Sequence, residues 1–137
     1  MTRTVYVNGE WLAEDKATVS IFDRGFLMAD GVYEVTSVLD GKLIDFGGHC
    51  ARLRRSLSEL DMPSPATDEA LLAIHRELLE RNNVVDGMIY LQVTRGNPGD
   101  RDFTFPDPAS TKPTLVLFTQ SKPGLADNPQ AKIGLKV

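Results

Sequence analysis

The chain has 137 residues, 42% of them hydrophobic and 25% charged, which fits one soluble domain with enough apolar material for a core. A net charge of −4 argues against nucleic acid as a partner, because phosphate binding needs a basic surface. A single cysteine, Cys50, excludes an internal disulfide, and no apolar run resembles a membrane span or a signal peptide, so a cytoplasmic protein is expected.

The chain begins with the pattern of two β-hairpins. Each has two runs of strand-forming residues around an Asn-Gly or Asp-Gly dipeptide, which strongly favours a tight turn. In the longest run, Tyr33 and Glu34 lie on opposite faces, because the side chains of a strand alternate. The runs are Thr4–Val7 and Glu10–Leu12 in the first hairpin, and Gly31–Leu39 and Lys42–Ile44 in the second.

The spacing of apolar residues then changes to that of two amphipathic helices. The first begins at Cys50 and ends before Pro63, because proline disfavours helical backbone in the residue that precedes it. The second begins near Thr67, whose hydroxyl suits an N-cap, and ends at Asn82. The apolar stripes are Leu53, Leu57 and Leu60 in the first helix and Leu71, Ile74 and Leu78 in the second.

Two further strands and a long loop follow the helices. Met88–Arg95 alternates in polarity, and Thr114–Thr119 is an apolar run typical of a central strand. Between them, Gly96–Pro108 is rich in glycine, proline and aspartate, which predicts a loop. Hairpins, two helices and two more strands in this order predict an α+β fold with a largely antiparallel sheet.

The sequence predicts three parts along the chain. Residues 1–120 form a small α+β domain, and the proline- and asparagine-containing segment 121–130 is a linker. Residues 131–137 alternate in polarity again, which predicts the first strand of a further domain. Because that strand stops at Val137, the chain is expected to be a fragment of a longer protein.

Spacing alone defines few functional residues. No spacing of histidine, cysteine or carboxylates resembles a metal site, and His75 lies beside an apolar stripe, where a structural role is expected. Arg52 lies near a helix start after two glycines, which suits either a phosphate clamp or an exposed arginine. Arg101 on the glycine-rich loop suits carboxylate binding or simple solvation. Three carboxylates are too scattered in the sequence to predict an acid–base pair: Asp23, Asp30 and Glu34.

Three stretches, in this order and at this spacing, resemble class IV (fold type IV) pyridoxal-phosphate aminotransferases. The third stretch resembles the D-amino-acid transaminase form of that family, and the similarity runs from about Thr4 to the end of the chain. The stretches are Asp23–Phe26 leading to Asp30–Val35, His49–Leu53, and Tyr90–Gly96 followed by Arg101–Pro106.

The resemblance implies that this chain is the small N-terminal domain of a homodimeric enzyme with pyridoxal 5'-phosphate as its cofactor. It implies that Arg52 binds the cofactor phosphate and that Tyr33 faces the cofactor and substrate pocket. Arg101 would bind the substrate α-carboxylate from the neighbouring subunit, whereas Arg95 would be a structural arginine or one that supports the binding residues from behind. Phe103 departs from the best-known subgroup, which has a histidine there, so a strict preference for D-amino acids with two carboxylates stays open.

The resemblance also implies that no catalytic residue lies in this chain. The Schiff-base lysine would lie beyond Val137, in a C-terminal domain, so residues 1–137 alone are expected to be inactive and to lack the cofactor. The full-length protein would transfer an amino group between a D-amino acid and a 2-oxo acid. The alternatives are a branched-chain aminotransferase, a 4-amino-4-deoxychorismate lyase, or a non-catalytic domain that binds a partner.

Overall fold

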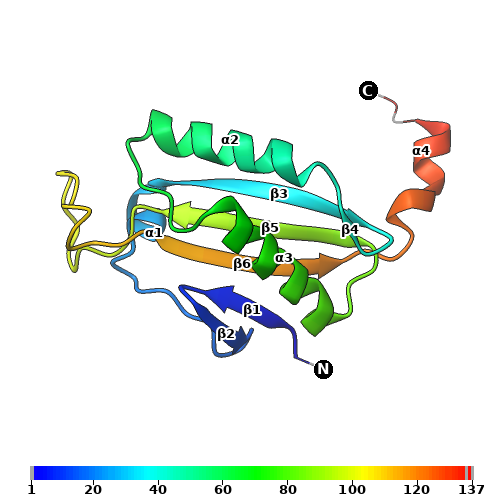
Figure 1. Ribbon diagram of the computed structural model, residues 1–137, viewed down its shortest axis with the longest axis horizontal. Coiled ribbons are helices and arrows are strands. Elements are labelled where there is room, and N and C mark those ends of the chain that lie inside the picture. The colour runs from blue at the N-terminus through cyan, green and yellow to red at the C-terminus, as the bar shows by residue number, and fades with distance from the viewer. Residues whose placement is uncertain (1, 135, 137) are drawn as a thin grey trace.

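The computed structural model describes residues 2–134 and 136. These residues form a six-stranded sheet in the order β2-β1-β6-β5-β3-β4, in which every neighbouring pair is antiparallel (Figure 1). The sheet confirms the predicted α+β fold with a largely antiparallel sheet. The strands are β1 Thr4–Val7, β2 Glu10–Ala13, β3 Gly31–Leu39, β4 Lys42–Leu43, β5 Gly87–Thr94 and β6 Thr114–Ser121.

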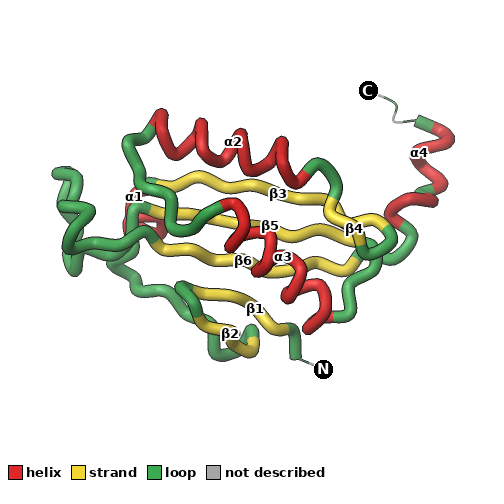
Figure 2. Tube along the Cα trace, viewed as in Figure 1, coloured by secondary structure: helices red, strands yellow, loops and turns green. Residues whose placement is uncertain are grey.

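Two long helices cover one face of this sheet, as the tube view in Figure 2 shows. The N-cap of α3 is Thr67, whose hydroxyl accepts a hydrogen bond from the amide of Ala70, as the sequence predicted. The helices are α1 Arg24–Met28, α2 Phe46–Glu59, α3 Asp68–Asn82 and α4 Pro129–Ile133, with a short 3₁₀ turn at Leu125–Asp127.

Helix α2 begins four residues before the predicted start at Cys50. Two glycines occupy its first turn, and their low helix propensity hid the true beginning from sequence patterns. At Gly48 a Cβ atom would overlap the carboxylate of Asp45, so the glycine lets that side chain fold over the first turn. At the other end, Leu60 is the C-cap and partly exposed, whereas the sequence predicted it in the buried stripe.

The core lies between the helices and the covered face of the sheet. Leu53 and Leu57 of α2, with Leu71 and Leu78 of α3, form one wall. The buried residues of the central strands form the other wall: Ile89, Leu91, Val93, Leu115 and Leu117. Burying each such side chain stabilises the fold by roughly 1.5–3 kcal/mol. This packing fixes which residues of β3 point toward α2 and which point away from it.

The opposite face of the sheet carries a row of aromatic side chains. The rings of Tyr33 and Tyr90 stack at 5.7 Å, and those of Tyr90 and Phe118 at 5.0 Å, so the row crosses three adjacent strands. Tyr33 is 63% exposed. As the sequence predicted, Tyr33 and Glu34 therefore lie on opposite faces of β3.

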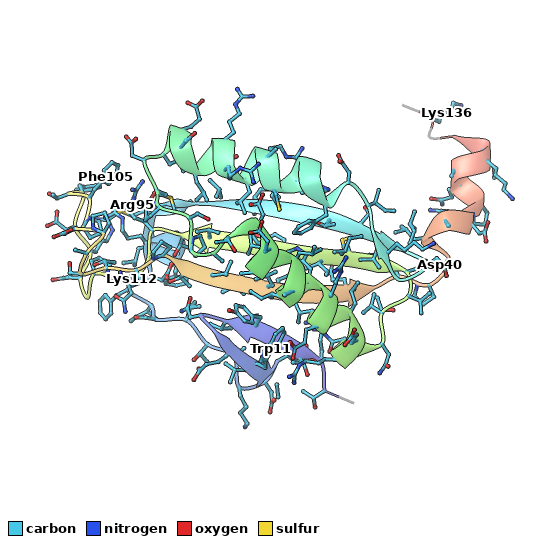
Figure 3. All side chains as sticks on the ribbon, in the orientation of Figure 1. Trp11, Asp40, Arg95, Phe105, Lys112 and Lys136 are labelled. Atoms are coloured by element: carbon cyan, nitrogen blue, oxygen red, sulfur yellow. The ribbon has the colours of Figure 1, made fainter. Side chains whose placement is uncertain are left out.

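One end of the sheet extends into the long loop between β5 and β6 (Figure 1). Phe105 and Lys112 lie on this loop and Arg95 lies at its base, whereas Asp40 lies at the opposite end of the molecule (Figure 3). The loop confirms the prediction made for Gly96–Pro108.

The strand predicted for residues 131–137 is not found in the described part of that segment. Pro129–Ile133 is a helix instead, and residues 135 and 137 lie outside the described residues. The helix is favoured locally, because the Asn128 side chain accepts a hydrogen bond from the amide of Gln130 and Pro129 occupies the first turn. Strand β6 also continues to Ser121, one residue into the predicted linker. The division into domains stays a prediction.

Candidate functional site

The candidate site begins with a carboxylate on the helix-covered face of β3. Glu34 is 5% exposed, and a buried carboxylate requires charged or hydrogen-bonding partners. Arg52 supplies two of them, with Nε donating to Oε1 at 2.8 Å and Nη2 donating to Oε2 at 2.8 Å. Nδ1 of His49 lies 2.7 Å from Oε2. One turn of α2 separates His49 from Arg52, so both side chains reach the same strand residue.

These contacts determine the ionisation of Glu34 and Arg52. Burial alone would raise the pKa of the Glu34 carboxyl, but the hydrogen bonds from Arg52 and His49 outweigh it, and the pKa lies below its ordinary value. The hydrogen bond with Glu34 in turn raises the pKa of Arg52. Because an ionised carboxylate only accepts hydrogen bonds, Nδ1 of His49 carries the proton that faces it. The site is therefore an ion pair supported by an imidazole.

Arg52 keeps unused donors on its outer edge. Its side chain is 66% exposed, although the carboxylate that holds it is buried. Glu34 accepts hydrogen bonds from Nε and from one N–H of Nη2. The remaining nitrogen, Nη1, has no hydrogen-bond partner among residues 2–134 and 136. A guanidinium fixed at one edge presents its other edge to an oxyanion at little entropic cost. The geometry fits a phosphate group.

Tyr33 lies on the open face of the sheet, which α2 and α3 do not cover (Figure 2). It is among the groups that raise the pKa of Arg52, although Glu34 has the larger effect. A shallow hollow beside it includes Gly31, Tyr90 and Gln92, and the hydroxyl of Tyr90 donates to Oε1 of Gln92 at 2.8 Å. Among the described residues no hydrogen bond or ion pair joins Tyr33 to Arg52, so the two predicted binding residues are related only through this electrostatic effect on the pKa of Arg52.

Arg101, the third predicted binding residue, lies apart from the other two. It is exposed on the projecting loop, and its guanidinium carbon lies 4.9 Å from the centre of the Phe103 ring. In the described part of the chain, no hydrogen bond or ion pair connects Arg101 to Tyr33 or Arg52. The predicted role of Arg101 across a subunit boundary is not tested by a single chain.

Sequence patterns missed Glu34 and His49 as the partners of Arg52. One signal pointed to Glu34: it is an acidic residue on the same strand face as Val32 and Thr36, which pack toward the helices. A charge on a buried face must have a partner, and the partners lie on the helix packed against that face. The three carboxylates that are scattered in the sequence each have a partner that the fold supplies: Thr114 for Asp23, Arg24 for Asp30 and Arg52 for Glu34.

Two residues that were not predicted to bind a ligand are buried and make contacts within the fold. Arg95 is 7% exposed and donates to the carboxylate of Asp30 and to the carbonyl of Leu60. His75 is buried, with Nδ1 2.7 Å from the carbonyl oxygen of Leu71 and its ring against Phe46. Burial lowers the pKa of His75, so its imidazole is neutral in the core.

The described residues contain no group of three or more histidine, cysteine, aspartate or glutamate side chains that could hold a metal ion. None of the helices described here is long and apolar enough to cross a membrane.

Comparison with known proteins assigns the family. Residues 31–137 match the model of the family described as Amino-transferase class IV, and the chain belongs to this family. It is 43% identical over 117 residues to a D-alanine aminotransferase of Staphylococcus epidermidis, a match that covers 85% of this chain and 41% of that protein. The chain thus spans about two fifths of the length of the relatives it matches.

Solved structures share the fold. A branched-chain aminotransferase of the archaeon Thermoproteus uzoniensis, solved with norvaline, gives a TM-score of 0.75 at 17% identity, over 88% of this chain and 41% of that one. A 4-amino-4-deoxychorismate lyase of Pseudomonas aeruginosa gives 0.68 at 26% identity, over 93% of this chain and 43% of that one. These similarities confirm the predicted fold type IV architecture of the N-terminal domain.

Proposed function

We propose that the whole protein is a pyridoxal 5'-phosphate-dependent transaminase that transfers an amino group between a D-amino acid and a 2-oxo acid. This chain is its small N-terminal domain. The observation that carries the proposal is Arg52, which the buried Glu34 holds with its outer donors free. Membership of the class IV family and the 43% identity to a D-alanine aminotransferase support it.

The cofactor, when bound, supplies an electron sink that stabilises negative charge on the amino-acid α-carbon. Arg52 contributes to holding its phosphate, because the guanidinium is always charged and already oriented by Glu34. Tyr33 forms one wall of the pocket, since its exposed ring lies on the open face and lines the hollow that includes Tyr90 and Gln92. The lysine that bonds the cofactor and moves the proton is supplied by sequence beyond Val137.

The substrate is held by the loop between β5 and β6. Arg101 binds the α-carboxylate in the neighbouring subunit of a homodimer, for which its exposure on a projecting loop is suitable. Phe103 lies against the Arg101 guanidinium and supplies no hydrogen-bond donor. The pocket therefore suits D-amino acids with one carboxylate, such as D-alanine, better than D-glutamate.

The 4-amino-4-deoxychorismate lyase reaction is a second candidate function, and one observation favours it over the branched-chain aminotransferase reaction. The lyase of Pseudomonas aeruginosa is 26% identical, whereas the branched-chain aminotransferase is 17% identical and supports the fold alone. The D-alanine aminotransferase is closer at 43%, and this difference favours the D-amino-acid reaction over the lyase reaction. A cytoplasmic location, which the single cysteine suits, is part of the proposal.

The test is a comparison of substrates with the whole protein, including the sequence beyond Val137. Turnover of D-alanine with 2-oxoglutarate should exceed turnover of L-leucine and of 4-amino-4-deoxychorismate. Preference for either of the last two would refute the proposed substrate class. Residues 1–137 alone should show no turnover, and borohydride reduction with pyridoxal phosphate should label no single lysine stoichiometrically. A size measurement and a cofactor titration on this chain distinguish a domain of a transaminase from a non-catalytic domain that binds a partner.

A further inference from the structure

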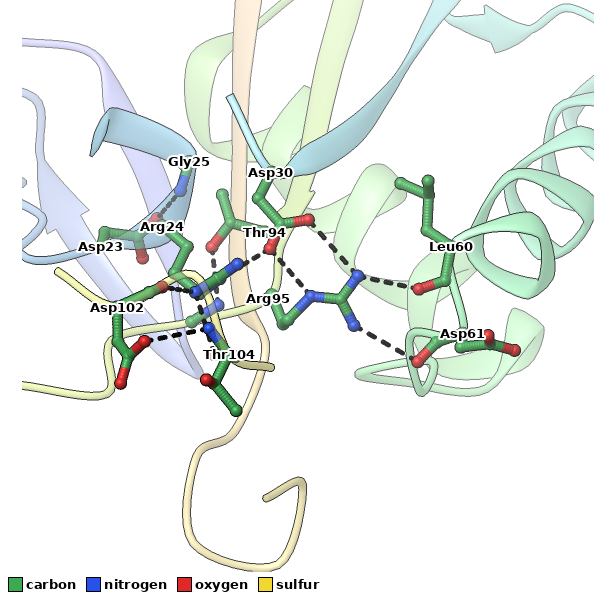
Figure 4. A network of polar contacts seen from close by, with 11 residues as sticks. Asp23, Arg24, Gly25, Asp30, Leu60, Asp61, Thr94, Arg95, Asp102 and Thr104 are labelled. Atoms are coloured by element: carbon green, nitrogen blue, oxygen red, sulfur yellow. Dashed lines mark hydrogen bonds and ion pairs between the residues drawn. The ribbon is translucent and has the colours of Figure 1, made fainter. Parts of the chain in front are cut away.

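A second cluster of charged residues lies where the long loop leaves the sheet (Figure 4). Arg24 is 3% exposed, and its Nε donates to Oδ2 of Asp30 at 2.7 Å. Arg95 donates to the same oxygen from Nε at 2.8 Å and to Oδ1 from Nη2 at 3.3 Å. One carboxylate thus holds two buried guanidinium groups from different elements. We refer to these three residues as the Asp30 cluster.

The Asp30 cluster fixes the middle of the loop through main-chain atoms. Nη1 of Arg24 donates to the carbonyl oxygen of Asp102 at 2.5 Å and approaches that of Thr104 at 3.4 Å. These two carbonyls stand on either side of Phe103, and Arg101 directly precedes the first of them. Because the contacts are to the backbone, they fix the path of the chain and not one side chain.

An aromatic ring closes the cluster from the loop side. The ring centre of Phe105 lies 4.0 Å from the guanidinium carbon of Arg95 and 5.6 Å from that of Arg24. Phe105 itself is 62% exposed, so its ring is held by the two cations and is not part of the core.

The two ends of the loop are attached to the same short segment. The amide of Arg24 donates to the carbonyl of Gly96 at 2.9 Å, next to the end of β5. The hydroxyl of Thr114, at the start of β6, donates to Oδ2 of Asp23 at 2.6 Å. Oδ1 of Asp23 accepts from the amide of Gly25, which fixes the first turn of α1. The segment around α1 therefore holds the loop at its beginning, middle and end.

We propose that Arg24 is a positioning residue that holds the loop carrying Arg101 in the orientation in which Arg101 meets a substrate carboxylate. The proposal rests on the proposed function, which gives Arg101 its role. Arg24 acts on substrate affinity through the backbone at Asp102 and Thr104, and it does not touch the substrate. Helix α1 leads directly into β3, the strand that carries Tyr33. The same segment of chain therefore also determines the geometry of the loop that carries Arg101.

Charge and burial support this role over a purely stabilising one. Burial would raise the pKa of Asp30, but hydrogen bonds from Arg95 and Arg24 outweigh it and hold that pKa below its ordinary value, so the carboxylate stays ionised at neutral pH. Arg95 binds Asp30, Leu60 and Asp61 and so connects β5 to the end of α2. The bond of Arg24 to the loop is not needed for that connection. Arg24 is the member of the cluster whose Nη1 faces the loop.

The first test measures loop order without any need for turnover. The variant Arg24→Lys keeps a cation near Asp30, but an ammonium group cannot also reach the Asp102 carbonyl. In the purified chain, hydrogen exchange of the amides of residues 99–104 should rise about tenfold, with α3 and β5 unchanged. The matched control is Arg81→Lys, an arginine that also has a carboxylate partner and an aromatic ring, Glu77 and Trp11. It should leave loop exchange unchanged.

A second variant keeps the proposal testable if Arg24→Lys disturbs the fold. Phe105→Leu removes an exposed ring from the cluster and should also raise exchange in residues 99–104, by about threefold. Unchanged loop exchange in either folded variant, or an equal rise throughout the sheet, overturns the positioning role.

The kinetic test uses the whole protein. Arg24→Lys should raise the KM for D-alanine about tenfold while kcat and the cofactor absorbance change less than about twofold. A fall in kcat with an unchanged KM overturns the proposal. If the unmodified protein does not turn over D-alanine, the proposed function fails, while the exchange experiment still reports on the loop.

Discussion

Two clusters of arginine and carboxylate in this domain use the same chemistry for different purposes. In the Glu34 site, the carboxylate is buried and the arginine is exposed, with Nη1 of Arg52 unused among the described residues. In the Asp30 cluster, both arginines are buried and their donors are directed at Asp30 and at backbone carbonyls. The first arrangement leaves N–H donors of the arginine free to bind a ligand, whereas in the second the donors hold the chain in place.

The comparison gives a physical criterion for recognising a binding arginine. An ion pair alone does not mark a ligand site, because both clusters contain one. The useful quantities are the exposure of the guanidinium and the number of its N–H groups that the protein already uses. By this criterion Arg52 is available to a ligand, and Arg24 and Arg95 are not.

The largest expected effect comes from removing the shared carboxylate of the Asp30 cluster. Asp30→Ala leaves two buried guanidinium groups without their counter-charge, which should lower the free energy of unfolding by about 3–5 kcal/mol. Asp30→Asn keeps one acceptor oxygen and should lose less. Urea unfolding of the purified chain measures both. A matched control is Asp15→Ala, since Asp15 pairs with Lys16 in solvent and its loss should cost less than about 0.5 kcal/mol. Equal losses at the two positions would contradict the structural role of the cluster.

The second effect should appear in binding more than in stability. In the whole protein, Arg52→Ala should weaken pyridoxal phosphate binding by roughly 2–4 kcal/mol, because it removes one partner of a charge pair. Arg52→Lys should restore only part of the affinity, since an ammonium cannot donate to two oxygens in the geometry of a guanidinium. Cofactor titration followed by absorbance gives the affinities. Unchanged affinity in Arg52→Ala would remove the basis for the phosphate site.

Much of the fold could be predicted from the sequence because its signals are local. The turns at Asn8–Gly9 and Asp40–Gly41 and the alternation in β3 and β5 are properties of neighbouring residues. The start of α2 was missed because glycines conceal a helix that tertiary packing stabilises. The predicted strand after residue 130 was wrong for residues 131–133, where capping at Asn128 favours a helix.

The candidate site was less accessible to sequence reasoning. Tyr33, Arg52 and Arg101 were reached through resemblance, because spacing alone did not separate them from ordinary exposed side chains. The partners of Arg52 depend on how α2 crosses β3, which no local pattern contains. Similarly, Arg24 meets Asp102 across 78 positions of sequence. Such pairings are set by the packing of elements and appear only in the folded chain.

The third prediction asks whether the exposed loop arginine binds substrate. Arg101→Ala should raise the KM for D-alanine by about 10–100-fold and leave the cofactor spectrum intact, because Arg101 is separate from Arg52 in the fold. Phe103→His should add a donor beside Arg101 and favour D-glutamate relative to D-alanine. Steady-state kinetics of the whole protein with both substrates decides the matter. A normal KM in Arg101→Ala would mean that Arg101 is a solvated charge.

The smallest expected effect is the dependence of the Glu34 site on pH. The pKa of Glu34 in the folded chain lies below its ordinary value of 4.5, so its pairing stabilises the fold above about that pH and is lost as the pH falls through the folded pKa. Glu34→Gln should cost about 1–2 kcal/mol at neutral pH, since Arg52 is largely solvated, and the difference from the unmodified chain should shrink as the pH falls from neutral through the lowered pKa of Glu34. Urea unfolding across this range measures it, with Glu59→Gln as an exposed control. A difference that stays constant with pH would show that the carboxylate charge contributes nothing to this pairing.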